Sequence, residues 1–367
     1  MLPDTFASKI LGSLIVLSAV LMSTGCLDRT PKQSGVFVTD DGGEGWRAAP
    51  DLAAPDANVP DAYPPLEVTA VGASAEAPDR VFAGTEDDLY RSTDAGRNWE
   101  EITGSLPQVK AVAVRDISID PRAPGTVFVA GVSEGYGKVF RSTDEGKSFE
   151  AVFTGSVPGQ AATAVAFGPD TTTVFVGDQE GNVYRSRDRG DSWQRVFSTE
   201  SVVTSLAATG PHLFAGTLGS GVFYSPNTGD TFTPVNTGLP TDARSVWSMA
   251  VGNGGLYLGT EEGLFLTKDF GRSWRNVGNP LPEVGGRIQA VAAAGSQVFF
   301  GTNAVVYKVT PSGDRFVPRQ LRLARNVTDL VAVSPERLYA GAHHRDFNFS
   351  ERFVPGLPEF NLNSNRR

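Results

Sequence analysis

Carboxylates are the side chains most able to do chemistry, because the chain has 41 Asp and Glu but only 3 His and 1 Cys. A pair of carboxyl groups about 5 to 9 Å apart is what a glycoside hydrolase needs. The single Cys excludes an internal disulfide and Cys-rich zinc or iron–sulfur sites. The sequence shows no Ser/His/Asp spacing, no HExxH and no phosphate-binding loop. We therefore predict no catalytic residue, metal or cofactor, and leave a carboxylate pair open.

Five larger or polar residues stand out when seven repeated apolar segments are aligned. The first aligned column contains Thr69, Arg115, Thr163, Thr204, Trp247, Gln289 and Thr328. The second contains Ala70, Asp116, Ala164, Ser205, Ser248, Ala290 and Asp329. In one interpretation Arg115 pairs with a carboxylate and Trp247 fills a channel. In the other, Arg115, Asp116, Trp247, Gln289 and Asp329 form a polar recognition site with an aromatic platform.

Acidic residues gather after another repeated segment, which ends in Gly. They predict an acidic rim suited to a basic partner or to loosely bound cations, although ordinary solvated turns have the same composition. His343 and His344 follow the last such segment and are expected to be surface residues, not metal ligands. The acidic residues are Glu86, Asp87, Asp88, Glu134, Asp178, Glu180, Glu261 and Glu262.

One phrase, S/T-x-D-x-G-x-x-W/F, recurs along the chain. Its third residues lie 53, 50, 44, 39 and 42 positions apart, a period typical of propeller blades or solenoid units. We expect the Asp or Asn to accept backbone N–H groups in a turn and the closing ring to be buried between sheets. One carboxylate per phrase is too few for calcium, which needs about six to eight oxygens. The paired residues are Asp41 and Trp46, Asp94 and Trp99, Asp144 and Phe149, Asp188 and Trp193, Asn227 and Phe232, and Asp269 and Trp274; a degenerate seventh copy spans 310–316.

Each repeat contains enough short apolar segments for four strands, which is one propeller blade. The first phrase has no inner strands before it, and the segments 327–333 and 338–342 have no phrase after them. Pairing the two chain ends completes a seventh blade. The sequence therefore predicts an all-β, seven-bladed propeller of four-stranded blades over residues 35–345, closed by a composite N- and C-terminal blade. Residues 50–65 are expected to be a surface loop, and 346–367 an irregular tail.

The phrase resembles the Asp-box, or BNR repeat, of sialidases, xyloglucanases, sortilin-type receptors and photosystem II assembly factors. The resemblance implies that the phrases lie at the periphery, away from any ligand. The Arg-Ile-Pro segment of sialidases is missing before Thr39. The catalytic Asp pair of xyloglucanases needs two propellers. We therefore expect a non-enzymatic platform that binds a protein; the alternatives are an exported glycoside hydrolase or carbohydrate-binding protein, and a protein like the photosystem assembly factors.

The amino terminus has the pattern of an export signal. Lys9 precedes an apolar run over residues 10–22, too short to span a bilayer, and Ser23-Thr-Gly-Cys26 resembles a bacterial lipobox. This predicts a signal peptide over 1–25, lipid on Cys26, a tether over 26–34 and a place on the extracytoplasmic side of the cell envelope. A plain secretory signal with a chance Cys is the alternative. The net charge of −9 argues against a nucleic-acid partner, and we expect a monomer.

We expect the exported chain to partition into detergent and to incorporate labelled palmitate through Cys26, because acyl chains anchor stably when two or more are present. Replacing Cys26 by Ser should abolish both properties. Unchanged partitioning of the Cys26→Ser variant would show that the anchor lies elsewhere or that none exists.

Overall fold

The structure is a computed structural model that describes residues 35–49, 67–102, 111–277, 287–312, 315–321, 323 and 326–343. These residues all belong to one compact unit, Gln33–Arg367. The expected signal peptide, Cys26, the tether, the 50–65 loop, His344 and the 346–367 tail lie outside the described residues. Within the described part of the chain, no helix has the length and apolar character needed to cross a membrane.

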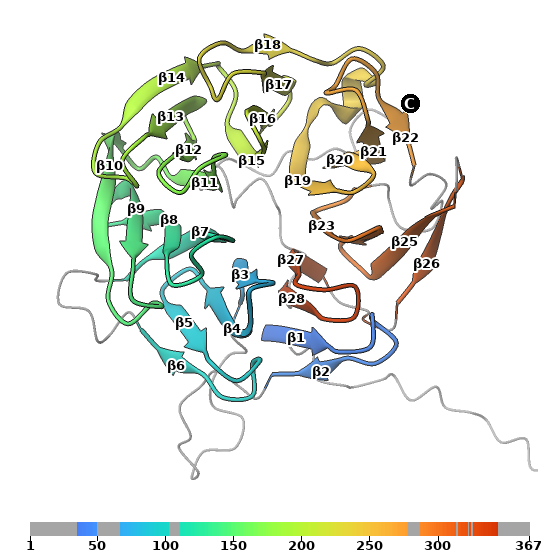
Figure 1. The fold of residues 1–367 in the computed structure, drawn as a ribbon, viewed down its shortest axis with the longest axis horizontal. Coiled ribbons are helices and arrows are strands. Elements are labelled where there is room, and N and C mark those ends of the chain that lie inside the picture. The colour runs from blue at the N-terminus through green and yellow to red at the C-terminus, as the bar shows by residue number, and fades with distance from the viewer. Residues whose placement is uncertain are drawn as a thin grey trace, which may run out of the picture. The chain divides into compact units, whose positions relative to one another are not determined.

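Seven four-stranded antiparallel sheets form a ring around a central axis, so the predicted seven-bladed propeller is confirmed (Figure 1). We number the blades in chain order. Blades 1 to 3 contain β3 (Ala70–Ser74), β4 (Ala77–Gly84), β5 (Leu89–Ser92) and β6 (Glu100–Glu101); β7 (Ala113–Ile119), β8 (Val127–Ser133), β9 (Tyr136–Ser142) and β10 (Glu150–Pro158); and β11 (Ala162–Phe167), β12 (Val174–Asp178), β13 (Asn182–Ser186) and β14 (Gln194–Ser198). The first strand of each blade lines the axis and the last lies at the rim.

Blades 4 to 6 repeat this order, and a short 3-10 helix, η2 (Thr241–Arg244), precedes blade 5. Their strands are β15 (Val203–Thr209), β16 (His212–Thr217), β17 (Gly221–Ser225) and β18 (Thr233–Pro234); β19 (Val246–Gly252), β20 (Gly255–Thr260), β21 (Gly263–Thr267) and β22 (Arg275–Asn276); and β23 (Ala290–Ala294), β24 (Gln297–Gly301), β25 (Val306–Ser312) and β26 (Arg315–Gln320). The seventh sheet has the order β2 (Arg47–Ala48), β1 (Gly35–Thr39), β28 (Leu338–His343) and β27 (Asn326–Ala332).

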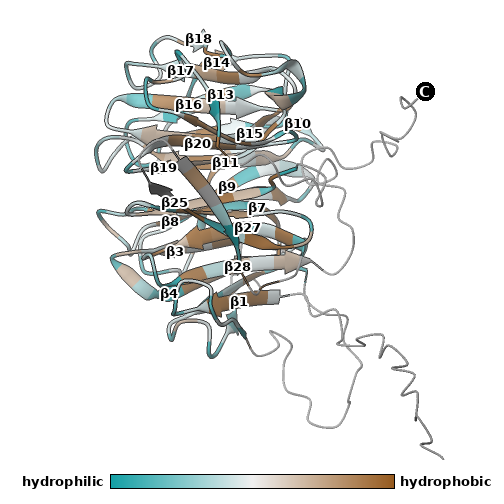
Figure 2. Ribbon diagram, turned by 90° about the vertical axis from the view of Figure 1, so that its right-hand side faces the viewer, coloured by the Kyte–Doolittle hydropathy of each residue, from teal (hydrophilic) through white to brown (hydrophobic). Residues whose placement is uncertain are grey.

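The hydrophobic core lies between neighbouring blades. Phe82 and Leu89 of blade 1, for example, are buried in one cluster with Val114, Ile117 and Phe140 of blade 2. The apolar strands are therefore covered on both faces, and polar residues gather in the loops at the two ends of the ring (Figure 2). This explains why the second strand of each repeat is a continuous apolar run and does not alternate.

The glycine that ends the second strand is required by the approach of the next blade in every blade except blade 2, where a Cβ atom at Gly131 would instead meet Ala113 of the same blade. A Cβ atom added at Gly84 would lie 2.3 Å from Val114, and one at Gly341 would lie 2.8 Å from Val68, both in the following blade. Contacts this short are sterically excluded. The glycine is thus the point at which two sheets can come close enough to exclude water between them.

The composite blade closes the ring. β1 pairs with β28 in a continuous antiparallel register that runs from Gly35 opposite Ala342 to Thr39 opposite Leu338. In Figure 1 the first strand of the described chain lies beside the last one. The Thr328 hydroxyl of blade 7 donates to the carbonyl of Val68 in blade 1, 2.7 Å away. The two ends of the propeller are held by hydrogen bonds and packing.

The seventh copy of the repeated phrase does not interrupt strand pairing as the others do. β25 and β26 stay paired as far as Ser312 opposite Arg315, whereas in the other blades the phrase separates the third strand from the fourth. The degenerate copy at 310–316, which is one residue shorter than the others, therefore coincides with continuous strand pairing.

Removing residues 326–367 should cause aggregation, because β1 would lose its partner and the edge of blade 1 would be exposed. Removing only 347–367 should be far milder, because the sequence of that segment has little strand pattern and contains no repeat phrase. Soluble yield and melting temperature, both measured without the signal peptide, compare the two truncations. Equal stability of the longer truncation and the parent would contradict closure by the chain ends.

Candidate functional site

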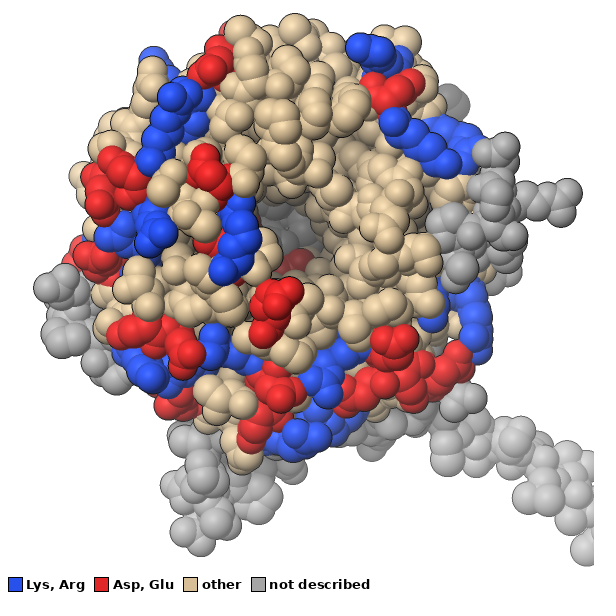
Figure 3. All heavy atoms as spheres, viewed as in Figure 1, with Lys and Arg blue, Asp and Glu red and all other residues tan. Residues whose placement is uncertain are grey.

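The ring has two chemically different ends. We call one end the mouth face: it carries the loops between the second and third strands and the starts of the inner strands. We call the other end the box face: it carries the hairpins between the first and second strands and the turns formed by the repeated phrase. The predicted polar columns and acidic rim belong to the mouth face, and the phrases belong to the box face. Figure 3 looks at the box face and down the central channel.

The first aligned column is a β-bulge that recurs around the axis. In blade 2, Val114 pairs with Gly131 and Asp116 with Ala130, so Arg115 is the extra residue. The strand register shifts in the same way at Thr163, Thr204, Trp247 and Thr328. The side chains of all seven members of the column, Thr69 and Gln289 included, are buried. A bulge re-aims a side chain without ending the strand, and here it turns each of these residues toward the neighbouring blade.

The threonines of this column tie the blades together. The Thr204 hydroxyl donates to the carbonyl of Val246 in the next blade at 2.5 Å, and Thr69 donates in the same way to Val114 at 2.8 Å. Thr163 and Thr328 make the equivalent bonds to Val203 and Val68. A buried carbonyl without such a donor would cost stability. In this column Thr is therefore a structural residue. Arg115, Trp247 and Gln289 have no hydroxyl and cannot make this bond to the next blade.

The acidic members of the second column are also used between blades. Asp116 Oδ2 accepts the backbone N–H of Val165 at 2.7 Å, and Asp329 Oδ2 accepts that of Val71 at 2.9 Å. Ser248 Oγ does the same for Val291 at 3.1 Å. Each acceptor belongs to one blade and each donor to the next. Asp116 and Asp329 thus hold adjacent inner strands together and do not form a pair of free acids.

Arg115 pairs with a carboxylate, as the first interpretation of the column expected. Its Nη1 and Nη2 lie 2.9 and 3.1 Å from the two oxygens of Glu86, in the loop of blade 1. The Arg115 residue is 3% exposed, whereas the side chain of Glu86 is 43% exposed. A two-point contact of this kind fixes the orientation of both groups. The guanidinium is consequently held at the mouth face with its charge balanced by Glu86.

Trp247 is covered by an arginine that the sequence analysis did not single out. The guanidinium carbon of Arg287 lies 5.2 Å from the centre of the Trp247 ring, and its Nε lies 2.8 Å from Glu261 Oε2. Trp247 is only 5% exposed, so it does not offer a bare aromatic platform. The side chains of Arg287 and Glu261 are about a quarter exposed, at 24% and 26%. The exposed part of this cluster is therefore the ion pair of Arg287 and Glu261, whose guanidinium packs against the face of the indole ring.

Gln289 comes two residues after Arg287 and directly before the inner strand β23. The residue is 2% exposed, and within the described residues its Oε1 atom has no hydrogen-bond donor. Buried amide oxygens are usually paired. Arg287, Trp247, Glu261 and Gln289 form what we call the mouth cluster, at the seam between blades 5 and 6. Arg287 could have been found from its place next to the aligned column, two residues before Gln289.

The predicted acidic rim is partly neutralised. Glu86, Glu134 and Glu261 each form an ion pair, with Arg115, Lys138 and Arg287 respectively. Asp178 is buried and accepts hydrogen bonds from the amide and side chain of Asn182; its burial raises the pKa of its carboxyl despite these bonds.

Other acids of the rim stay accessible. Glu180 and Glu262 are exposed, as are Glu86 and Asp87. Burial, with the charges of Glu101 and Asp87, raises the pKa of Asp88. No group of three or more His, Cys, Asp or Glu side chains suited to a metal occurs within the part of the chain that the structure describes.

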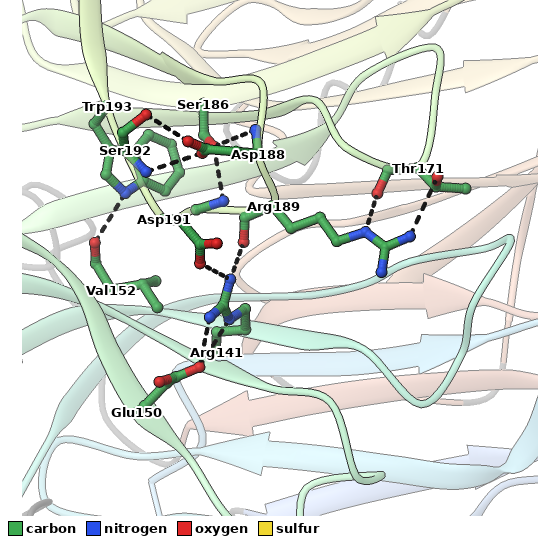
Figure 4. A network of polar contacts seen from close by, with 11 residues as sticks. Arg141, Glu150, Val152, Thr171, Ser186, Asp188, Arg189, Asp191, Ser192 and Trp193 are labelled. Carbon is green, nitrogen blue, oxygen red and sulfur yellow. Dashed lines mark hydrogen bonds and ion pairs between the residues drawn. The ribbon is translucent and has the colours of Figure 1, made fainter.

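The repeated phrases form compact turns at the box face. In blade 3, the Ser186 hydroxyl donates to Asp188 Oδ1 at 2.7 Å, and the amide of Ser192 donates to the same oxygen at 2.9 Å (Figure 4). The Trp193 indole N–H donates to the carbonyl of Val152 in blade 2 at 2.9 Å. Matching bonds to the third residue occur at Asp41, Asp94, Asp144, Asn227 and Asp269.

The closing rings pack between blades as expected, although not all of them are fully buried. Phe149 and Trp274 are buried, and Trp46, Trp99, Trp193 and Phe232 are half-buried against the interblade clusters. One edge of these rings stays in contact with solvent because the turn lies at the end of the sheet. The turns are thus structural, and they lie on the face opposite the mouth cluster.

Hydrogen bonds within the turns stabilise the ionised carboxylates. At Asp188, the hydroxyls of Ser186 and Ser192 with the Ser192 amide lower the pKa to about 2. At Asp94, burial raises the pKa, but hydrogen bonds from Asn98 and Ser92 outweigh it and the pKa also falls to about 2. Asp144 and Asp269 have pKa values of about 2 for similar reasons. Such carboxylates are poor proton donors or acceptors near neutral pH.

Comparison with known proteins identifies the fold and no family. No protein-family model matches the chain, and no curated protein matches it in sequence. The GH74 xyloglucanase from Xanthomonas campestris is similar in structure with a TM-score of 0.61 at 17% identity, over 76% of this chain and 51% of that one. YCF48 bound to D1 peptide has a TM-score of 0.58 at 17% identity, over 76% of this chain and 94% of that one. The WD40 repeats of RRP9 are similar with a TM-score of 0.60 at 13% identity, over 78% of this chain and 92% of that one.

These likenesses show a shared propeller fold, because propellers of such low identity have unrelated functions. The chain spans about half the length of the xyloglucanase that it matches. It spans nearly the whole of the YCF48 chain.

Replacing Asp94, Asp144, Asp188 and Asp269 together by Asn should leave folding at pH 7 largely intact, because Asn227 already fills this position in blade 4. In the parent, the lowered pKa values contribute stability that is present above the ordinary Asp value of 3.8 and is lost as the pH falls toward about 2. The variant should lose less stability over that window, as measured by urea midpoints. Asp188→Ala, which removes the acceptor, should instead cost about 1–3 kcal/mol at pH 7.

An equal loss of stability between pH 4 and pH 2 in the parent and in the fourfold Asn variant would contradict this account of the turns.

Proposed function

We propose that the chain is a non-enzymatic, lipid-anchored propeller of the bacterial cell envelope whose mouth face binds a segment of another protein. The mouth cluster is the observation that carries this proposal. It combines a covered indole, a guanidinium and a carboxylate that are partly exposed, and a buried amide oxygen without a donor among the described residues. Oriented Arg and aromatic groups with polar neighbours are typical of the energetically important residues in protein interfaces.

The position of the first strand supports a partner at the membrane. Gly35 opens β1 and lies opposite Ala342, at the mouth end of blade 7. A tether that leads into Gly35 thus reaches the ring from the mouth side. Nine residues, 26–34, extend to about 30 Å at most. An anchor on Cys26 would therefore hold the mouth face near the bilayer, where the extracytoplasmic segments of membrane proteins are found.

The fate of the carboxylates argues against the hydrolase alternative. Asp116 and Asp329, the acids nearest the axis in the aligned columns, accept backbone N–H groups of the next blade, and Glu86 and Glu261 are paired with arginines. A glycosidase needs one carboxylate free to attack or to activate water and one raised in pKa. The match to nearly all of YCF48, which was solved with a peptide bound, fits the binding function better than the match to half of a xyloglucanase.

A photo-crosslinking amino acid placed at Glu262, which is exposed beside Glu261, should form discrete adducts with an envelope protein in living cells. The same group at Arg97, exposed in a box-face turn, is the matched control and should not form them. Adding Arg287→Ala should reduce the Glu262 adduct about tenfold, because a charge-assisted contact is lost.

Equal adducts from positions 262 and 97 would contradict a binding site at the mouth face. Release of sugar from xyloglucan or from sialyl-lactose by the purified chain would establish the hydrolase alternative instead.

A further inference from the structure

The box face contains a group of stacked rings at a position where other blades have charged contacts. In blades 1, 2 and 3, the Arg before the phrase reaches into the next blade's turn. Arg91, Arg141 and Arg185 donate from Nη1 to the carbonyls of Glu145, Arg189 and Thr228, at 3.0, 2.7 and 2.6 Å; Figure 4 shows the second of these bonds. In blade 4 the corresponding residue is Tyr224, and the next turn presents Phe270.

The rings form a nearly parallel series that runs from the core to the surface. Phe214 is buried and lies 4.9 Å from Tyr224, with 27° between their planes. Tyr224 lies 5.9 Å from Phe270 at 21°. His212 stacks on Phe270 at 4.1 Å, and its Nδ1 is 2.7 Å from the Tyr224 hydroxyl. Phe270 ends the series and is 41% exposed, so part of its ring faces solvent.

The fold does not require an aromatic ring at position 270. The turn holds this residue in the left-handed region, with a φ of 59°. The same turn position is taken by Ala95, Glu145, Arg189 and Thr228 with φ values of 60°, 68°, 61° and 56°. A left-handed backbone is unfavourable for a bulky side chain. An exposed ring kept in such a conformation indicates a role at the surface.

Phe270 lies between an uncharged surface and a charged turn. Almost no charged side chains lie on the box face over β15 to β20 (Figure 3), whereas Lys268, Asp269 and Arg272 flank Phe270 in its own turn between β21 and β22. Val251 is 38% exposed at the same end of blade 5, in the cross-strand row of Leu256 and Thr267. Arg272 lies near enough to Tyr224 to oppose the rise that burial causes in the pKa of its phenol.

We propose that Phe270, His212 and Tyr224, with Arg272 at their edge, form a second binding site that takes a pyranose ring of a neutral carbohydrate. A pyranose has a flat face of C–H groups, which are attracted to the negative face of an aromatic ring. Its edge carries hydroxyl groups, which the imidazole, the phenol and the guanidinium can bind. A second copy of the chain would need about 800 Å² of surface from each partner, far more than these few residues offer.

The test uses the chain's three histidines, of which only His212 belongs to the stack. In the full-length chain labelled with 13C-histidine and kept in detergent, the His212 ring signal, assigned with His212→Gln, should shift when cellohexaose or maltohexaose is added at millimolar concentration. Phe270→Ala should weaken this binding about tenfold. The Ala should be tolerated, since Ala95 adopts the same backbone.

Glu145→Ala is the matched control, because it changes the same turn position in blade 2, and it should leave the shift unchanged. The proposal is overturned if neither oligosaccharide moves the His212 signal, or if Phe270→Ala binds as well as the parent. It is also overturned if the signal moves only with protein concentration, which would make the stack a contact between copies. Each outcome is independent of the mouth face, so its failure and that of the proposed function are distinguishable.

Discussion

The contact between the inner strand of one blade and the glycine of the preceding blade is the constraint on which the ring depends. Val114, Val203, Val246, Val327 and Val68 lie where a Cβ atom of that glycine would stand. Four of these valines, all but Val327, also present the carbonyl that accepts a threonine hydroxyl of the preceding bulge. Apolar contact and hydrogen bond thus act at one point. Water is excluded there without leaving a buried carbonyl unpaired.

This arrangement explains which residues were free to vary. Where Thr ties two blades, nothing else can use the position. Where Arg115, Trp247 or Gln289 replaces the Thr, the hydrogen bond from a Thr hydroxyl to the next blade is absent. The larger side chain can then contact other groups. Arg115 and Trp247 are then covered by partners from loops of the mouth face, Glu86 directly and Glu261 through Arg287. A similar replacement occurs at the box face. Blades 1 to 3 have a hydrogen bond from an Arg to a carbonyl of the next blade, and blade 4 has stacked rings at that position.

The sequence was sufficient to predict the fold, because the phrase, the glycine-ended segments and the unpaired ends each repeat with the blade. It also placed Arg115, Trp247 and Gln289 in one column, and in the structure all three are buried, with a bulge at Arg115 and at Trp247. The roles of Asp116 and Asp329 could not be read in this way, because their partners are backbone N–H groups of another blade and leave no side-chain pattern. The Phe270 stack was missed for a related reason, because it joins residues of neighbouring blades that no spacing within one repeat connects. Arg287 stood next to the aligned column and could have been found there, but its contact with Trp247 of blade 5 leaves no pattern in the sequence.

The composite blade has a consequence for the order of events when the chain leaves the ribosome and, if exported, crosses a membrane. Among the strands that the structure describes, β1 and β2 emerge first, yet β28 and β27, which complete their sheet, are made last. Val36 must wait for Gly341, and blade 1 must wait for Thr328 and Asp329. The entropy of closing so long a loop grows only slowly with its length, but the search is slow because the contact is so distant in sequence. During that delay β1 has only the short strand β2 beside it and its other edge is unpaired, which makes it a natural binding segment for a holdase chaperone.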